Sequence, residues 1–252
     1  ASTYRSRRRA LINKEHPESG IVLLLGNQPS PQNYAANTHP FRQDSTFLYY
    51  FGINRPNLYG LIDLDEGRST LYGDDGTLEE AIWSGESPSL HEVAAGVGLE
   101  RVAPVSALPD ALATARDQNR PIHFLPPYRP DHRLQYQSLL GLSSGHIEDH
   151  VSEPLIRAVV HQRSRKSDAE VAEFEEALTR TAQLHQYAQR HAAPGITEQE
   201  IFGAMTGLVT RMGSAFSFTP TCSVRGEVLH NHSYPNTLAE GDLLLVDAGA
   251  CS

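Results

Sequence analysis

The first 150 residues alternate short apolar runs with amphipathic stretches. The apolar runs are bounded by Gly, Pro, Asn or Asp, as strands of a sheet commonly are, and they cover residues 21–26, 46–53, 58–65, 69–73 and 121–126. Between them, residues 89–98 and 107–116 have helical spacing. Ser89 and Glu92 are placed to form a capping box, in which each side chain satisfies a backbone N–H group of the other residue. This pattern predicts an α/β domain with a mixed sheet over residues 1–152.

From residue 153 onward, the pattern changes to longer helices. Residues 167–193 carry residues three or four positions apart that form one stripe of a long amphipathic helix: Val171, Phe174, Leu178, Ala182 and His185. Ser167 and Glu170 supply a second capping box at its start. The stripe predicts one helix over nearly the whole segment.

The next helix has the best specified boundary in the chain. Pro194 and Gly195 end the preceding helix, and Thr197 with Glu200 forms a third capping box. The two isoleucines that flank this box have the spacing of a hydrophobic staple, Ile196 and Ile201.

Two strand-like segments follow the helices, residues 214–224 and 242–250. A sheet this small cannot cover two long helices and pair its own edges. We therefore expect residues 153–252 to be the start of a larger domain, completed by more of the same chain or by another chain.

Composition excludes several classes of protein. The formal net charge is −9, which gives no general basic field for nucleic acid, and no apolar stretch reaches the length of a membrane span. No secretory signal is visible, so we expect a cytoplasmic location and neither nucleic acid nor membrane as a partner. The two cysteines, Cys222 and Cys251, are too few and too far apart to suggest a disulfide framework, and we interpret both as reduced thiols.

Asp247 follows four large apolar residues, Leu243 to Val246, near the end of the chain. An aspartate before Ala-Gly is commonly a turn former that bonds its own backbone. However, a carboxylate at the end of a buried strand is costly unless it is paired, protonated or bound to a cation. Both interpretations are open from the residues alone.

His230 and His232 form an H-x-H pair in "VLHNHSYPN". On a strand, this spacing places both imidazoles on one face, where they could bind a metal ion or a substrate. In a loop, the same pair is ordinary polar surface. A third hypothesis makes Cys222 a nucleophile with His230 as its base, although a lone cysteine in an apolar strand usually serves packing.

Several segments resemble, in chain order, the landmarks of Xaa-Pro aminopeptidase (aminopeptidase P), a metallopeptidase of the creatinase/prolidase group. They are "HPFRQDSTFLYYFGI", "AIWSGESPSLHEVAAGVGLERVAPVSAL", "LIRAVVHQRSRKSDAEVAEFEEA", "APGITEQEI" and "LHNHSYPNTLAEGDLLLVDAGA". The last is the most specific, because the family places a metal-binding aspartate seventeen positions after a substrate-binding histidine, as His230 and Asp247 stand here.

The resemblance implies an N-terminal ribonuclease-H-like (creatinase N-terminal) domain, followed by a pita-bread α+β catalytic domain that holds two metal ions, usually Mn²⁺. It makes Asp247 the first metal ligand and His230 the group that contacts substrate and steadies the tetrahedral intermediate. It also implies peptides with proline in second position as substrates, and a homodimer or homotetramer. The other ligands of the family lie beyond the corresponding point, so we expect these 252 residues to be the front part of a longer enzyme, inactive and metal-free alone.

Two other functions are compatible with the same landmarks. Within the group, prolidases cut dipeptides and creatinase uses no metal, although "FRQDSTFLYYFG" favours the aminopeptidase. In another class, some pita-bread domains bind peptides without catalysis. Retention of Asp247 and His230 argues against such a binder.

Overall fold

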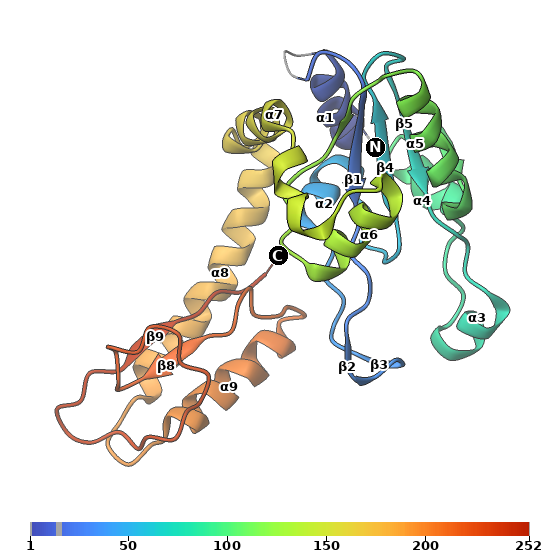
Figure 1. The fold of residues 1–252 in the computed structure, drawn as a ribbon. Coiled ribbons are helices and arrows are strands. Elements are labelled where there is room, and N and C mark those ends of the chain that lie inside the picture. Colours follow the sequence, from blue (N-terminus) through green and yellow to red (C-terminus); the bar gives the residue numbers. More distant parts are fainter. Residues whose placement is uncertain (1, 14–16, 252) are drawn as a thin grey trace. The chain divides into compact units, whose positions relative to one another are not determined.

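The computed structural model describes residues 2–13 and 17–251, which form two compact units (Figure 1). The first unit contains residues 1–164 and the second contains residues 165–252. The division between these compact units falls after Ser164, because helix α7 (Glu153–Ser164) packs on the first unit, and the expected domain boundary after residue 152 stays a prediction. Leu155 and Val159 of this helix are buried in the core of that unit.

A five-stranded mixed sheet forms the centre of the first unit. Its strands, in spatial order, are β6 (Arg101–Ala103), β5 (Arg68–Tyr72), β4 (Tyr59–Asp63), β1 (Ile21–Leu25) and β7 (Ile122–His123). The β1–β4 and β4–β5 pairs are antiparallel, whereas β1–β7 and β5–β6 are parallel. The α/β class and the mixed sheet are therefore confirmed. A separate hairpin consists of β2 (Pro31–Tyr34) and β3 (Asn37–Thr38).

Helices cover both faces of this sheet because β1 is apolar on both sides. Val22 and Leu24 pack into a cluster that includes residues of α1 (Ser2–Asn13), α2 (Ser45–Phe51), α4 (Leu90–Gly96) and α7. The alternate residues of β1 pack into a second cluster with α5 (Leu108–Asp117) and α6 (Pro130–Leu140). A strand buried on both faces needs the continuous apolar run that the sequence shows there.

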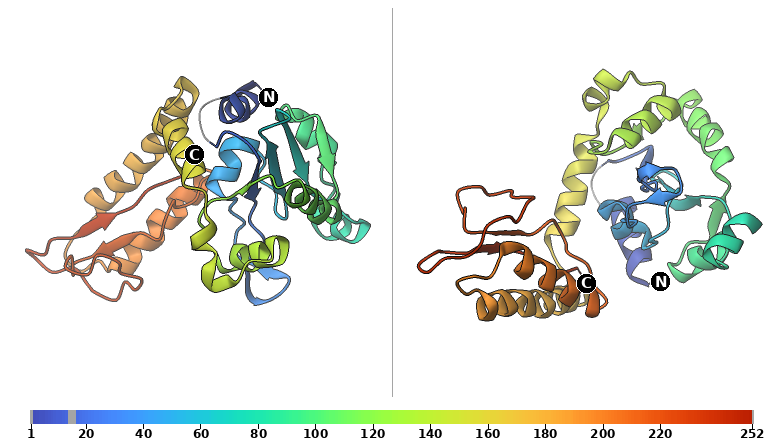
Figure 2. Two further views of the ribbon diagram at one scale, coloured as in Figure 1. Left: turned by 45° about the horizontal axis from the view of Figure 1, so that its top comes forward. Right: turned by 90° about the horizontal axis from the view of Figure 1, so that it is seen from below.

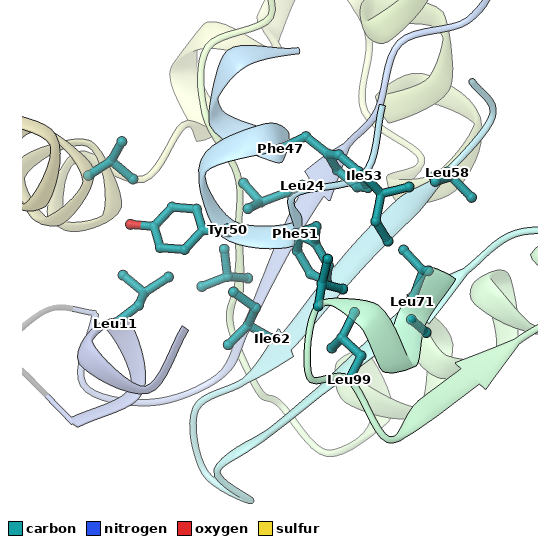
Figure 3. Packing of buried hydrophobic residues seen from close by; sticks show 14 of the residues in the cluster. Leu11, Leu24, Phe47, Tyr50, Phe51, Ile53, Leu58, Ile62, Leu71 and Leu99 are labelled. Carbon is teal, nitrogen blue, oxygen red and sulfur yellow. The ribbon is translucent and has the colours of Figure 1, made fainter. Parts of the chain in front are cut away.

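Residues 46–53 were expected to form a strand, and this prediction is wrong. The Asp44 carboxylate accepts hydrogen bonds from the backbone N–H groups of Thr46 (2.9 Å) and Phe47 (2.8 Å), which caps α2. Helical spacing then buries Phe47, Tyr50 and Phe51 together, next to Leu24, Ile62 and Leu71 (Figure 3). The aromatic run suggested a strand, but the cap and the core contacts determine a helix.

Three further helices were not predicted. They are α3 (Leu78–Ser84), α6 and α7, and α3 begins with a capping box of its own between Thr77 and Glu80. The short 3₁₀ segments of the described chain are η1 (Val105–Ala107), η2 (Ser144–His146) and η3 (Glu148–His150). The predicted box between Ser89 and Glu92 is confirmed at the start of α4.

The second unit packs two long helices against a two-stranded antiparallel sheet. The helices are α8 (Asp168–His191) and α9 (Glu198–Arg211), and the strands are β8 (Thr221–Ser223) and β9 (Leu245–Asp247). Figure 2 (right) shows α8 and α9 lying side by side, as they do in Figure 1. Both predicted capping boxes are confirmed. Both strands are shorter than the strand-like segments 214–224 and 242–250 that the sequence shows.

The face of α8 that is buried differs from the stripe expected from the sequence. Val171, Phe174 and Leu178 are 43%, 51% and 63% exposed, whereas Leu184 and Ala188 are buried against α9. The spacing correctly predicted the helix, but it selected the wrong face, because Ala182 is exposed and His185 is only half-buried. No helix in the described ranges is both long and apolar enough to cross a membrane.

Candidate functional site

Asp247 lies at the end of β9, and its side chain is exposed. The expectation of a buried acid after a buried apolar run is wrong, because Leu243 is 88% exposed and Leu245 is 36% exposed. Only Leu244 and Val246, at the alternate positions, pack against the core of the unit. The Asp247 carboxylate makes no hydrogen bond to any residue that the structure describes, so the turn-forming alternative is not observed either. An exposed carboxylate of this kind can accept a ligand without rearrangement of the core.

His230 lies in a turn after β8, and it is also exposed. Thr221 connects it to Asp247: Thr221 is the strand partner of Asp247, and its hydroxyl donates to the carbonyl oxygen of Leu229 (3.0 Å), directly before His230. Thr221 therefore contacts both Asp247 and the residue directly before His230. Among the described residues, no group of three or more His, Cys, Asp or Glu side chains is placed to hold a metal ion.

His232 does not lie on a strand face shared with His230, which is the arrangement that the H-x-H spacing would produce on a strand. Residues 230–236 form an irregular segment rather than a strand, so the loop interpretation of the pair applies. Asn231 stabilises a turn by accepting a hydrogen bond from the Ser233 N–H group (2.7 Å). An open hollow of about 620 Å³ next to α9 is lined by Thr197, Gln199, Phe202, His232, Ser233, Tyr234 and Pro235. Two of these lining residues, Phe202 and Tyr234, stack with ring centroids 4.1 Å apart.

Among the described residues of this unit, Glu198 is the buried carboxylate, and no pattern in the sequence selects it. It is fully buried at the first position of α9. Its carboxylate accepts hydrogen bonds from the N–H of Val224 (2.8 Å), the N–H of Asn236 (3.2 Å) and the Asn236 side-chain amide (3.0 Å). These contacts fix both ends of the loop 224–236, which carries His230. An acid at the start of a helix is so common that its position alone reveals nothing of this role.

The pKa of Glu198 reflects two opposing effects. Burial raises the pKa, but hydrogen bonds from Asn236, Val224 and Ser223 outweigh burial and hold the pKa below its ordinary value. The carboxylate is therefore ionised without a cationic partner. Neutral N–H donors stabilise the Glu198 carboxylate, which is the role that a metal ion was expected to have at Asp247.

Cys222 is unsuited to the nucleophilic role considered from the sequence. The thiol is fully buried in β8, and burial, with a smaller contribution from the charge of Glu198, raises its pKa to about 11. A thiolate is therefore scarce at neutral pH. Its packing among the core residues of the second unit agrees with the structural interpretation.

We expect the two thiols to differ sharply in reactivity. Cys251 is partly exposed, so a disulfide reagent should label it at least a hundredfold faster than Cys222 in the folded chain at pH 7.5. Time-resolved mass spectrometry of the labelled protein measures both rates. In the Cys251→Ser variant, the labelling rate of Cys222 is measured alone. Equal labelling rates in the folded protein would show that the pKa and burial of Cys222 are not as described.

Two family models match the chain in succession. The model "Aminopeptidase P, N-terminal domain" matches residues 4–123, and "Metallopeptidase family M24" matches residues 172–252. The chain therefore carries an aminopeptidase P N-terminal domain, followed by part of a domain of metallopeptidase family M24. The expected combination of a creatinase-type N-terminal domain with the beginning of a pita-bread domain is confirmed at the level of fold.

The curated relatives include aminopeptidases and dipeptidases. The chain is 26% identical to the Xaa-Pro aminopeptidase of Escherichia coli (strain K12) over 257 residues, which covers 98% of this chain and 58% of that protein. It is 24% identical to the human Xaa-Pro dipeptidase over 249 residues, with 92% and 48% of the two chains covered. The chain thus spans about half the length of the relatives it matches.

Solved structures show the same fold. Aminopeptidase PepP of Pseudomonas aeruginosa superposes with a TM-score of 0.82 at 22% identity, over 100% of this chain and 59% of that one. A zinc-substituted E. coli aminopeptidase P in complex with product gives a TM-score of 0.79 at 23% identity, over 99% and 59%.

Proposed function

We propose that the full-length gene product is a metal-dependent aminopeptidase that releases the N-terminal residue from peptides with proline in second position. The observation that carries the proposal is the connection of His230 and Asp247 through Thr221, at the seventeen-residue interval of the resemblance. The two family models and the E. coli relative support the same reaction class. Residues 1–152 would form the aminopeptidase P-type domain and residues 153–252 the start of the catalytic domain.

In this proposal, Asp247 is one oxygen ligand of a divalent cation. The described residues do not complete such a site, because two ions that share a substrate need several terminal and bridging ligands and one carboxylate supplies a single position. When bound, divalent ions would supply a hydroxide nucleophile. His230 would donate a hydrogen bond to the oxygen that becomes negatively charged at the carbonyl before proline.

The proposed reaction class does not depend on which metal ion is bound, on the oligomeric state or on the location. Mn²⁺ is the metal that we expect, and other divalent ions would serve the same ligand chemistry. A homodimer or homotetramer, a cytoplasmic location and short proline-containing peptides as partners also stay predictions.

Substitutions in the full-length gene product test the two residues. With Mn²⁺ and an Arg-Pro-Pro peptide, we expect Asp247→Ala and His230→Ala each to lower kcat/KM about a hundredfold. His232→Ala is the matched control, since it removes an exposed imidazole two positions away and should leave kcat/KM within about threefold. If His232→Ala causes the larger loss, the assignment of His230 is wrong.

The 252-residue chain itself should not hydrolyse the same peptide. After chelation and reloading with Mn²⁺, its turnover should stay at background, because Asp247 alone cannot hold two ions. A measurable release of arginine, abolished by Asp247→Ala, would show that the chain completes the site in another way.

A prolidase is the second candidate, because the human Xaa-Pro dipeptidase matches 92% of this chain. The two activities separate by substrate length. A prolidase cleaves Ala-Pro and rejects Arg-Pro-Pro, whereas the aminopeptidase cleaves the tripeptide. If the full-length product binds such peptides without hydrolysing either one, it is a non-catalytic peptide binder.

A further inference from the structure

Five arginines line one small hollow in the first unit. The hollow has a volume of about 150 Å³ and lies between α1, the β4–β5 turn and the start of β6; the lining arginines are Arg5, Arg8, Arg9, Arg68 and Arg101. Glu100 is the only carboxylate among the described residues that line it. The chain as a whole has a net charge of −9, so this excess of positive charge runs against its general balance.

Arg8 is the buried member of the set, with 3% of its surface exposed. Its guanidinium donates to the carbonyl oxygens of Tyr50 (2.7 Å), Val97 (3.0 Å) and Gly98 (3.0 Å). These acceptors are neutral, and no carboxylate of the described chain pairs with Arg8. Burial, and then the charge of Arg5, lowers the pKa of Arg8 to about 10. Buried charges are normally compensated, so Arg8 leaves a positive charge without a counterion beside the hollow.

Two of the other arginines have exposed carboxylate partners, and Arg5 also donates to the carbonyl oxygen of Gly98 (3.4 Å). Arg5 approaches Glu100 at 3.5 Å, and the two side chains are 46% and 86% exposed. Arg68 pairs with Glu66, and both of these side chains are also substantially exposed. Surface pairs of this kind contribute little and exchange readily for a better partner.

Arg9 and Arg101 have unused donors. Both side chains are exposed, and neither makes a hydrogen bond or ion pair with any residue in the part of the chain that the structure describes. Arg9 lies one helical turn after Arg5, on the same side of α1, and Arg101 is paired with Thr70 at the start of β6. Two separate elements therefore bring free guanidinium groups to the rim of the hollow that Arg8 adjoins.

The shape and charge of the hollow select a class of ligand. The planar guanidinium fork matches the paired oxygens of a phosphate group better than it matches a spherical halide ion, and several arginines around one group are typical of phosphate recognition. The volume is below the roughly 300 Å³ at which sites for drug-sized molecules begin. We propose that this arginine-lined hollow binds a phosphate group, either as a small free anion or as the terminal group of a phosphorylated metabolite. This site is independent of the peptidase proposal, since it uses residues of the first unit alone.

Binding can be measured on the 252-residue chain by calorimetry and by thermal unfolding. The probes are inorganic phosphate, pyrophosphate and adenosine monophosphate, with potassium chloride adjusted to constant ionic strength. We expect phosphate or pyrophosphate to raise the unfolding midpoint in a saturable manner, whereas chloride alone does not. If adenosine monophosphate binds as well as phosphate does, the ligand is a phosphorylated metabolite; if only the inorganic anions bind, it is a free anion.

Matched double variants locate the binding. Arg9→Ala with Arg101→Ala removes the two unpaired guanidinium groups and should weaken phosphate binding at least tenfold, with an unchanged circular dichroism spectrum. Arg190→Ala with Arg211→Ala removes two exposed arginines of the second unit, changes the net charge equally, and should keep the affinity within twofold. An equal affinity in both double variants, or a response that depends only on ionic strength, overturns the proposal.

Discussion

Glu198→Ala should lower the free energy of unfolding of the second unit by about 4 kcal/mol. Three partly buried donors, the N–H groups of Val224 and Asn236 and the Asn236 side-chain amide, would lose a charged acceptor at once. The loop 224–236 would also lose the contact that joins its two ends. Urea unfolding, followed by circular dichroism of the 252-residue chain, measures the change.

The pH dependence separates the lost charge from a simple packing defect. Because the folded pKa of Glu198 is below the unfolded one, its contribution is complete above the unfolded pKa of about 4.3 and disappears as pH falls through the folded pKa. The difference between wild type and variant should therefore shrink below about pH 4. Glu240→Ala, which removes an exposed carboxylate, is the control and should change stability by less than about 0.5 kcal/mol. A difference that is constant from pH 7 to pH 3 would contradict the ionised state of Glu198.

Phe51→Ala should destabilise the first unit by about 4 kcal/mol, because a fully buried aromatic ring leaves a cavity when it is removed. The ring stacks on Phe47, with centroids 5.0 Å apart, and it lies directly over Gly60 of β4 (Figure 3 labels both rings). A Cβ atom added at Gly60 would stand 2.1 Å from the Phe51 ring. Gly60→Ala alone should therefore also be destabilising, by about 3 kcal/mol.

A double-mutant cycle tests whether these two positions interact directly. When Phe51 is alanine, the added methyl group at position 60 has space, so the double variant should be more stable than the sum of the single changes implies by about 2 kcal/mol. Chemical unfolding of the four proteins supplies the cycle. Additive changes would show that the glycine has a backbone role instead of a steric one.

Local sequence signals predicted the boundaries of elements better than their burial. The capping boxes at Ser89, Ser167 and Thr197 each require only residues within one helical turn, and all three are present. In contrast, residues 46–53 form an apolar run bounded by turn residues, which predicts a strand, whereas the side chain of Asp44 caps a helix there. An aspartate directly before the helix is a local signal of the same kind as the capping boxes.

The burial of the candidate site could not be predicted in the same way. Four apolar residues before Asp247 suggested a buried strand, but whether a strand is covered depends on segments far away in the chain. Glu198 shows the converse, since only the folded loop brings Val224 and Asn236 to its carboxylate. The family resemblance selected His230 and Asp247, and their roles stay predictions until the substitutions are measured.

The uncovered stripe of α8 has a practical consequence for handling the protein. Val171, Phe174 and Leu178 present apolar surface to solvent over about two helical turns. Surface of this kind promotes adhesion between molecules as protein concentration rises. Light scattering across a dilution series should accompany every calorimetric titration of this chain, so that self-adhesion is not mistaken for ligand uptake.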